Sequence, residues 1–206
     1  MEGRNCFVIT TNVDHQFQKA GFDHERLFYM QGDYGLFQQE DPAKQITYDN
    51  EDWVVKAMEA QGFQKDENGE FLQLAADPEN IRMEIPADLI PMSEDHRPLA
   101  MNLRIDSRFV QDDGWHEAFE RYDRFLREHR KDHVLYLELG VGYNTPGIIK
   151  YPFLQMTASN PNARYAVINN SGIFCPDEIR NQSICIEADL ASAIEALDQM
   201  TEAEIR

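Results

Sequence analysis

The sequence predicts an α/β fold, built on a doubly wound parallel sheet with a small insert module. Apolar segments that are typical of strands alternate with segments of helical periodicity, which is the pattern of successive β-α-β units. Polar residues recur directly after these apolar segments, and open α/β sheets bind their ligands at the carboxyl ends of strands. From residue 38 to residue 113 the apolar periodicity is broken and turn residues crowd together, which predicts the insert.

The composition indicates one globular domain, with or without such an insert. The 206 residues are 42% hydrophobic, which is enough for a core. There are 37 acidic and 19 basic residues, and the net charge of −18 repels phosphate backbones, so nucleic acid is not an expected partner. No apolar run approaches the roughly 20 residues of a membrane helix. Because no signal peptide is recognised either, we expect a cytoplasmic protein with no membrane partner.

The three cysteines do not form a motif. Cys6, Cys175 and Cys185 are scattered and odd in number, which predicts neither a disulfide framework nor a thiolate zinc site. Cys6 and Cys185 stand in apolar runs, so we expect them to be buried as small hydrophobic residues.

The first predicted strand is the apolar run 7–10, which leads into a polar cluster at residues 11–15, Thr-Asn-Val-Asp-His. A short helix over 16–20 follows and is stopped by Gly21. The local pattern alone favours a plain strand, turn and helix with solvated polar residues. Residues 26–30 predict a second strand, and residues 31–35 predict a loop punctuated by glycine. That loop is a second polar site, close in sequence to the first.

The insert contains two predictable elements. Residues 51–61 predict a helix, with Asn50 as its N-cap and Gly62 beyond its end. Residues 63–74 predict a hairpin around Asn68 and Gly69, the residue pair that type I′ turns favour.

The clearest helix of the chain is predicted over 115–126. Its apolar residues recur at helical spacing and form one face, with charged residues opposite. This face consists of Trp115, Ala118, Phe119, Tyr122, Phe125 and Leu126.

A strand over 134–139 opens into a glycine-rich turn at 140–147, and a helix is predicted over 148–156. This order can cradle a phosphate, because glycines let the backbone approach a ligand and a helix start offers free N–H groups. The full dinucleotide fingerprint is absent, and a tight strand-to-helix turn explains the pattern as well. Further strands are predicted at 163–168, ending in Asn169, and at 183–186. A closing helix over 190–200 is capped by Asp189.

Together, these motifs resemble the sirtuins, a family of NAD-dependent deacylases and ADP-ribosyltransferases, over almost the whole chain. Residues 11–14 look like the family's Gln-Asn-Ile-Asp motif beside the nicotinamide ribose. Gln31 and Gly32 stand where sirtuins usually carry His-Gly, and residues 140–145 are similar to the segment at the NAD phosphates. The match is closest to the macrodomain-linked class M branch, on residues 11–17, 31–35, 102–104 and 109–115.

The resemblance implies two sets of site residues in a Rossmann-like, sirtuin-like fold. The implied catalytic residues are Asn12, Asp14 and Gln31. The implied NAD-binding residues are Thr11, Asn12, Asp14, Gly140, Val141, Gly142, Asn144, Thr145 and Asn169. Asn12 would orient the acceptor or stabilise positive charge on the ribose, with Asp14 near the carboxamide. His15 is the imidazole beside this site, and packing or capping is favoured for it over a role as base.

The glutamine at position 31 bears on the reaction. The histidine that sirtuins usually carry there is a general base in deacylation, and a glutamine has no titratable group. Class M enzymes share this glutamine and transfer ADP-ribose to a lipoylated carrier protein like the glycine-cleavage H protein. The resemblance thus implies NAD, a protein acceptor and a macrodomain protein as partners. Deacylation is the other activity that the family name implies.

Two departures from the family count against activity. The chain begins after the family's first strand and Gly-Ala-Gly loop, so we expect a missing sheet strand and either lower stability or a partner segment. The family's zinc-binding cysteine pairs are absent, so we expect the module 38–113 to fold without zinc, beside an NAD-binding domain of 1–37 and 114–206. The sequence therefore leaves two hypotheses, an ADP-ribosyltransferase and a truncated, inactive sirtuin fold that binds a carrier protein or nucleotide.

Overall fold

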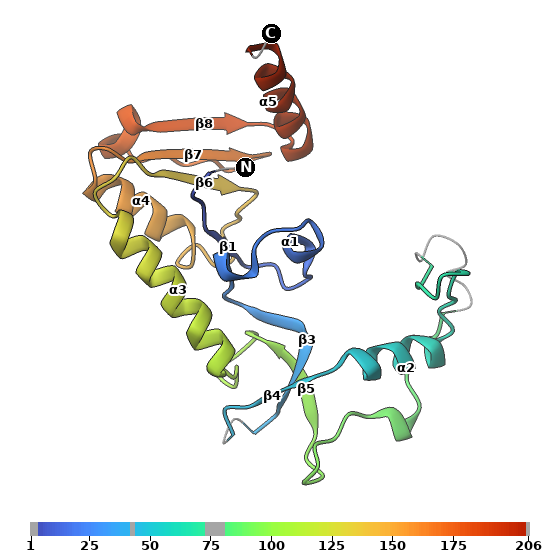
Figure 1. The fold of residues 1–206 in the computed structure, drawn as a ribbon. Helices are drawn as coiled ribbons and strands as arrows, with labels where there is room; N and C mark the ends of the chain where they lie inside the picture. Colours follow the sequence, from blue (N-terminus) through green and yellow to red (C-terminus); the bar gives the residue numbers. More distant parts are fainter. Residues whose placement is uncertain (1–3, 42–43, 73–80, 205–206) are drawn as a thin grey trace. The chain divides into compact units, whose positions relative to one another are not determined.

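The structure is a computed structural model that describes residues 4–41, 44–72 and 81–204, with side chains described to residue 200. It consists of two compact units, which we describe one at a time. One unit comprises residues 10–119, and the other joins the segment before residue 10 to the chain from residue 120 onward. Helix α3 (Asp113–His129) runs from the first of these units into the second (Figure 1).

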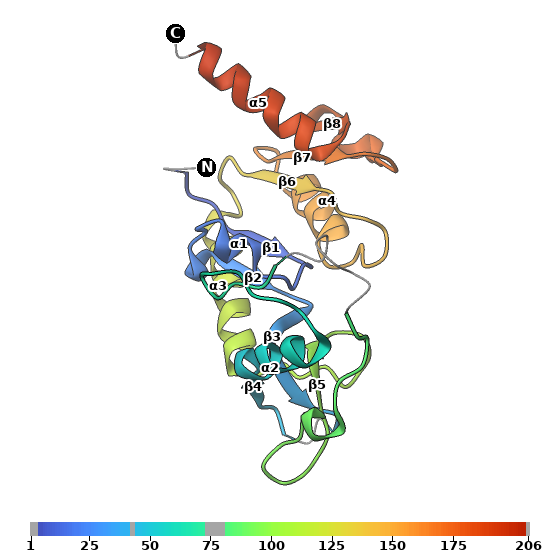
Figure 2. The ribbon, with the colours of Figure 1, turned by 90° about the vertical axis from the view of Figure 1, so that its right-hand side faces the viewer.

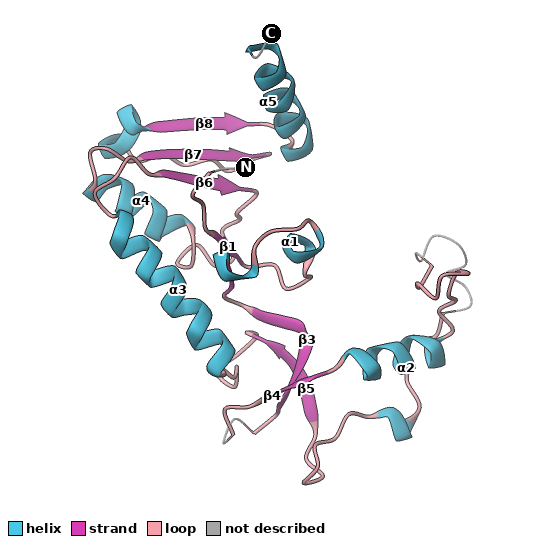
Figure 3. Ribbon diagram, in the orientation of Figure 1, coloured by secondary structure: helices cyan, strands magenta, loops and turns pink. Residues whose placement is uncertain are grey.

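The unit from residue 120 onward is built on a parallel sheet. Its strands are β6 (Leu135–Leu139), β7 (Arg164–Asn169) and β8 (Ser183–Glu187), in the order β6-β7-β8 (Figure 3). Both strand pairs are parallel, so the three carboxyl ends meet at one edge. Helix α4 (Lys150–Ser159) connects β6 to β7, and the 3-10 helix η5 (Asp177–Gln182) precedes β8.

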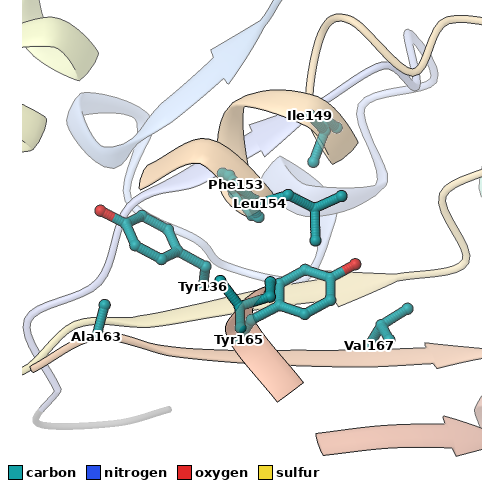
Figure 4. Close-up of a cluster of buried hydrophobic side chains, with 8 residues drawn as sticks. Tyr136, Ile149, Phe153, Leu154, Ala163, Tyr165 and Val167 are labelled. Atoms are coloured by element: carbon teal, nitrogen blue, oxygen red, sulfur yellow. The ribbon is translucent and has the colours of Figure 1, made fainter. Parts of the chain in front are cut away.

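Helix α4 covers one face of this sheet and forms the core of the unit (Figures 2 and 4). Tyr136, Tyr165 and Val167 alternate along β6 and β7 and point to this face, as the period of two residues in a strand requires. Ile149 and Phe153 meet them from the helix side. After β8 the chain enters α5 (Leu190–Glu204), whose start is capped because Asp189 Oδ1 accepts a hydrogen bond from Ser192 N at 3.0 Å.

The unit of residues 10–119 begins at the end of β1 (Val8–Thr10), which pairs with β2 (Leu27–Tyr29) in a two-stranded sheet. Between them lie α1 (Gln16–Lys19) and the 3-10 helix η1 (His24–Arg26). On the start of α3, Trp115 packs edge-on against Phe28 of β2, with ring centroids 5.2 Å apart. This contact fastens β2 to the helix.

The same unit holds an antiparallel sheet of three strands. Its order is β4-β3-β5, formed by β4 (Thr47–Asp49), β3 (Gly32–Gln39) and β5 (Leu99–Leu103). Helix α2 (Glu51–Gln61) follows β4 (Figure 1), and its Trp53 ring lies 4.9 Å from Phe37 of β3. The Trp53 Nε1–H donates to Leu89 O of the 3-10 helix η4 (Ala87–Leu89) at 2.7 Å.

A buried amide pair holds β3 to β5. The Gln38 side-chain oxygen accepts hydrogen bonds from Asn102 Nδ2 at 2.9 Å and from Val110 N at 3.0 Å. Because buried polar groups are costly unless they are paired, this network specifies how the two strands and the following loop fit together.

Most elements predicted from periodicity are confirmed. These are the helices at 16–20, 51–61, 115–126, 148–156 and 190–200, and the strands at 7–10, 26–30, 134–139, 163–168 and 183–186, to within a few residues at their ends. The structure is a mixed α/β arrangement with a parallel sheet and helices, as a Rossmann-like fold would have. The division at 37/38 and 113/114 stays a prediction, although its first boundary falls inside β3.

Other expectations were wrong. The predicted loop at 31–35 is largely the start of β3, because its pairing with β5 overrides the two glycines. The predicted hairpin at 63–74 is reduced to the isolated bridge Lys65↔Phe71 in its described part, and residues 73 and 74 lie outside the described residues. Cys185 is exposed, since β8 is the last strand of its sheet, and Cys6 is only half-buried. In the described part of the chain, no helix is long and apolar enough to span a bilayer.

Candidate functional site

The polar cluster after β1 lies alongside the start of β3. Two backbone hydrogen bonds place it there: Met30 N donates to Thr10 O at 3.1 Å, and Tyr34 N donates to Val13 O at 3.2 Å. Residues 11–12 and 31–33 therefore run side by side between these bonds. The structure thus brings the predicted residues Thr11, Asn12, Asp14 and Gln31 together within one unit.

The side chains of this cluster differ in exposure. Asn12 and Asp14 are exposed, whereas Thr11 and Gln31 are half-buried. Asn12 N donates to Thr10 Oγ1 at 3.0 Å, which tightens the turn after β1. The backbone oxygen of Gln31 accepts from Arg104 N at 2.9 Å, so the residue is anchored at the end of the sheet.

A histidine–carboxylate pair across the cluster was not predicted. The Nε2 atom of His15 lies within hydrogen-bond distance of Asp33 Oδ1, and the same oxygen accepts from Gly35 N at 2.6 Å. His15 adopts the left-handed backbone conformation, with φ of 57°, which few residues other than glycine do. The two side chains keep 37% and 23% of their surface exposed. We call this pair the His15–Asp33 dyad.

Two glycines of β3 allow close approaches, Gly35 to the dyad and Gly32 to β5. A Cβ at Gly35 would lie 2.8 Å from His15 Cε1, so only glycine leaves room for the imidazole ring. Gly32 has φ of +102°, and a Cβ there would lie 1.9 Å from the Asn102 carbonyl oxygen of β5. The register of β3 against β5 shifts between Asp33 and Phe37, and such bulges re-aim side chains. The glycines are therefore part of a strand whose shape serves the cluster.

Tyr29, at the end of β2, completes the cluster. Its ring lies edge-on to His15, with centroids 6.1 Å apart. Burial raises the pKa of its phenol to about 12, and the negative charges of Asp33 and Asp14 add to that rise. The hydroxyl is buried and has no hydrogen-bond partner among the described residues. It remains a protonated donor at neutral pH.

The glycine loop after β6 belongs to the other unit. Gly140 has φ of +64°, and its N–H donates to Ile168 O at 3.0 Å, so the chain turns sharply over the end of β7. Asn169 Nδ2 donates to Val141 O at 3.1 Å, while its Oδ1 accepts from Asn170 N at 2.9 Å. Asn169 thus fastens the loop, a role that the sequence did not indicate.

The predicted NAD-binding residues of this loop are open to solvent. Gly142, Asn144 and Thr145 are exposed, Val141 is half-buried, and a Cβ at Gly142 would meet nothing within 4 Å. The contacts to NAD that the resemblance assigns to these residues and to Asn169 stay predictions.

A buried charge network lies directly behind the loop. Lys150, the first residue of α4, forms an ion pair with Glu138 of β6, and Tyr165 Oη donates to Glu138 Oε2 at 2.7 Å. The Lys150 ammonium also lies 5.0 Å from the ring centre of Tyr143 in the loop. Burial and the contact with Glu138 raise the pKa of the Tyr165 phenol. The signal for this network was a charged residue inside the apolar strand 134–139.

The described residues contain no group of three or more His, Cys, Asp or Glu side chains that could hold a metal ion. The expectation of a zinc-free module remains a prediction, since this observation concerns only the described part of the chain.

Comparison with known proteins gives one informative relative. No protein-family model matches the chain. The chain is 34% identical over 196 residues to a protein from Staphylococcus aureus (strain Mu50 / ATCC 700699) named "Protein ADP-ribosyltransferase". The match covers 94% of this chain but 56% of the relative, so the chain spans little more than half the relative's length. The similarity therefore extends over nearly all the elements described above.

Proposed function

We propose that the protein is a sirtuin-type, NAD-dependent protein ADP-ribosyltransferase similar to the class M enzymes. The observation that carries this proposal is the cluster of Asn12, Asp14 and Gln31. Two backbone hydrogen bonds, Met30 N to Thr10 O and Tyr34 N to Val13 O, hold the segment after β1 beside the segment that contains Gln31. The similarity, over 94% of this chain, to a relative named "Protein ADP-ribosyltransferase" supports protein ADP-ribosylation, and the sirtuin type and NAD come from the resemblance.

The residues present fit NAD in two respects. The loop after β6 carries Gly140 in a conformation that favours glycine, and open space surrounds Gly142 and Gly147, so a pyrophosphate could approach the backbone closely. The loop also stands at the carboxyl ends of parallel strands, where ligands of open α/β sheets bind. Gly140, Val141, Gly142, Asn144 and Thr145 would hold the nucleotide there. Asn169 would hold the loop in shape, and its contact with the adenosine ribose rests on the resemblance alone.

NAD supplies an electrophilic ribose carbon with nicotinamide as leaving group. The amides of Asn12 and Gln31 can orient the ribose or the acceptor by hydrogen bonds, but neither can take up a proton at neutral pH. The Asp14 carboxylate is exposed, so it can reach a bound carboxamide or a developing positive charge. A glutamine in place of a base favours transfer over deacylation.

The acceptor is a further part of the proposal. From the class M resemblance, we propose a lipoylated carrier protein as acceptor and a macrodomain protein as a second partner. Nucleic acid and membrane are not among the proposed partners, and the net charge of −18 is consistent with the absence of nucleic acid.

The test combines binding and transfer. The protein is titrated with NAD by calorimetry up to millimolar concentration, and then incubated with NAD and lipoylated carrier protein. Mass spectrometry should find one ADP-ribose added to the carrier, and Asn12→Ala should abolish the addition while the fold is retained. If NAD does not bind, the proposal fails and the alternative of an inactive, carrier-binding fold is favoured. If Asn12→Ala stays active, Asn12 has no part in the mechanism.

A further inference from the structure

Transfer to an acceptor that carries a proton needs a group to receive that proton. Gln31 cannot receive it, because an amide has no basic atom at neutral pH. In the cluster after β1, His15 is the imidazole, the side chain most often used as a general base, and the carboxylates Asp14 and Asp33 lie beside it.

The contacts of His15 leave one ring nitrogen available. Nε2 faces Asp33 Oδ1, so the neutral ring is set with its N–H toward the carboxylate and its lone pair on Nδ1. Asp33 is itself held by the Gly35 N–H at 2.6 Å, which fixes the direction of the ring. With 37% of its side chain exposed, the His15 ring lies at the surface rather than in the core.

The surrounding backbone is shaped for this ring position. His15 has a φ of 57°, and its ring packs against Gly35. A Cβ at position 35 would lie 2.8 Å from His15 Cε1. A left-handed histidine whose ring packs against a glycine indicates that the ring keeps this position only while residue 35 has no Cβ. The exposed residues Asn12 and Asp14 precede it by three positions and one position.

We propose that the His15–Asp33 dyad is the base of the transfer reaction, a role that rests on the proposed function. The acceptor is then a protein side chain with a protic nucleophile, such as a hydroxyl, amine or thiol. In the step, the bond from the ribose C1′ to nicotinamide breaks, and its electron pair leaves with neutral nicotinamide. The nucleophile forms a bond to C1′ and its proton passes to His15 Nδ1. Asp33 stabilises the imidazolium and releases no proton.

The closing experiment uses the protein with NAD and lipoylated carrier protein, and follows nicotinamide release and carrier modification. His15→Ala should lower the transfer rate by about 100-fold or more while the KM for NAD is unchanged. Imidazole added to the solution should restore part of the activity of His15→Ala. Asp33→Asn should cause a smaller loss that imidazole does not restore, because the ring is present but misdirected.

His24→Ala is the matched control, since His24 is an exposed histidine of the same unit, and it should keep full activity. Gly35→Ala should reduce transfer by displacing the ring, with NAD binding retained. If the wild type transfers and His15→Ala transfers equally well, the dyad is overturned and the proposed function stands. The same holds if imidazole fails to rescue a stably folded His15→Ala. A wild type that binds NAD but never modifies the carrier contradicts the proposed function and the dyad together.

Discussion

Two hydrogen-bonded pairs of a basic and an acidic side chain stand at the two strand-end sites of this protein, and they differ in burial. Lys150 and Glu138, behind the glycine loop, expose 1% and 0% of their side chains. His15 and Asp33, in the cluster after β1, expose 37% and 23%. The same kind of contact therefore occurs once inside a core and once at a surface that a ligand can reach.

The difference in burial indicates a difference in role. In the core, desolvation is severe, and a charge stays ionised only when partners surround it, as Tyr165 and Lys150 surround Glu138. Such a network holds α4 and β6 in one arrangement beneath the loop. At the surface, solvent screens the pair and its net contribution to stability is small, so the pair is not needed to explain the fold.

The sharpest test of this comparison is removal of the buried cation. Lys150→Met should lower the free energy of unfolding by about 3–5 kcal/mol, because Glu138 would be left buried without its ionic partner. Denaturant unfolding measures the loss. The control Arg127→Met removes a cation from a surface pair on α3 and should change stability by about 0–1 kcal/mol. An equally small loss for Lys150→Met would contradict the view that the buried pair is structural and the exposed pair is not.

The double variant Lys150→Met with Glu138→Leu should recover most of that stability, since replacing both buried charges by apolar groups is often close to neutral. Recovery would show that the cost comes from the unpaired carboxylate, whereas persistent loss would assign it to packing.

A smaller loss is expected when the hydroxyl of Tyr165 is removed. Tyr165→Phe should cost about 1–3 kcal/mol, because Glu138 Oε2 would lose its donor in a buried site. Tyr151→Phe on α4 of the same unit is the control, since Tyr151 is exposed, and its effect should stay within about 0.5 kcal/mol. Thermal or denaturant unfolding distinguishes the two variants.

The tyrosines also predict a loss of stability in alkali. Burial raises the folded-state pKa of Tyr165 and Tyr122, and that of Tyr29 to about 12, above the ordinary value of 10.0. The stabilisation is therefore fully present below about pH 10 and is lost as the pH rises through the folded-state values. The melting temperature should therefore decrease as the pH is raised from below 10 to above 10. In Tyr165→Phe this decrease should be smaller. An unchanged slope in that variant would contradict the assignment to Tyr165.

The smallest stability effect is expected at the His15–Asp33 dyad. Asp33→Asn and His15→Ala should each change the free energy of unfolding by about 0–1 kcal/mol, as for other half-exposed pairs. Together with a large loss of transfer, that result would complete the contrast with Lys150→Met. A stability loss as large as that of Lys150→Met would show that the dyad is structural.

Sequence and structure contribute different parts of this picture. The helical face from Trp115 to Leu126, the strand 134–139 with its glycine turn, and the polar residues after residue 10 are all visible in the sequence. They are visible because helices and strands repeat every 3.6 and two residues, so neighbours along the chain carry the signal.

Tertiary structure alone decided the contacts that matter most here. The glycines in residues 31–35 predict a loop. Only pairing with β5, some 70 residues later along the chain, makes most of these residues part of a strand. His15 and Asp33 are 18 positions apart, and Lys150 and Glu138 are 12 apart across a turn. Because no local period links such residues, the sequence determined which groups the protein carries, and the fold decided which of them meet and how deeply each pair is buried.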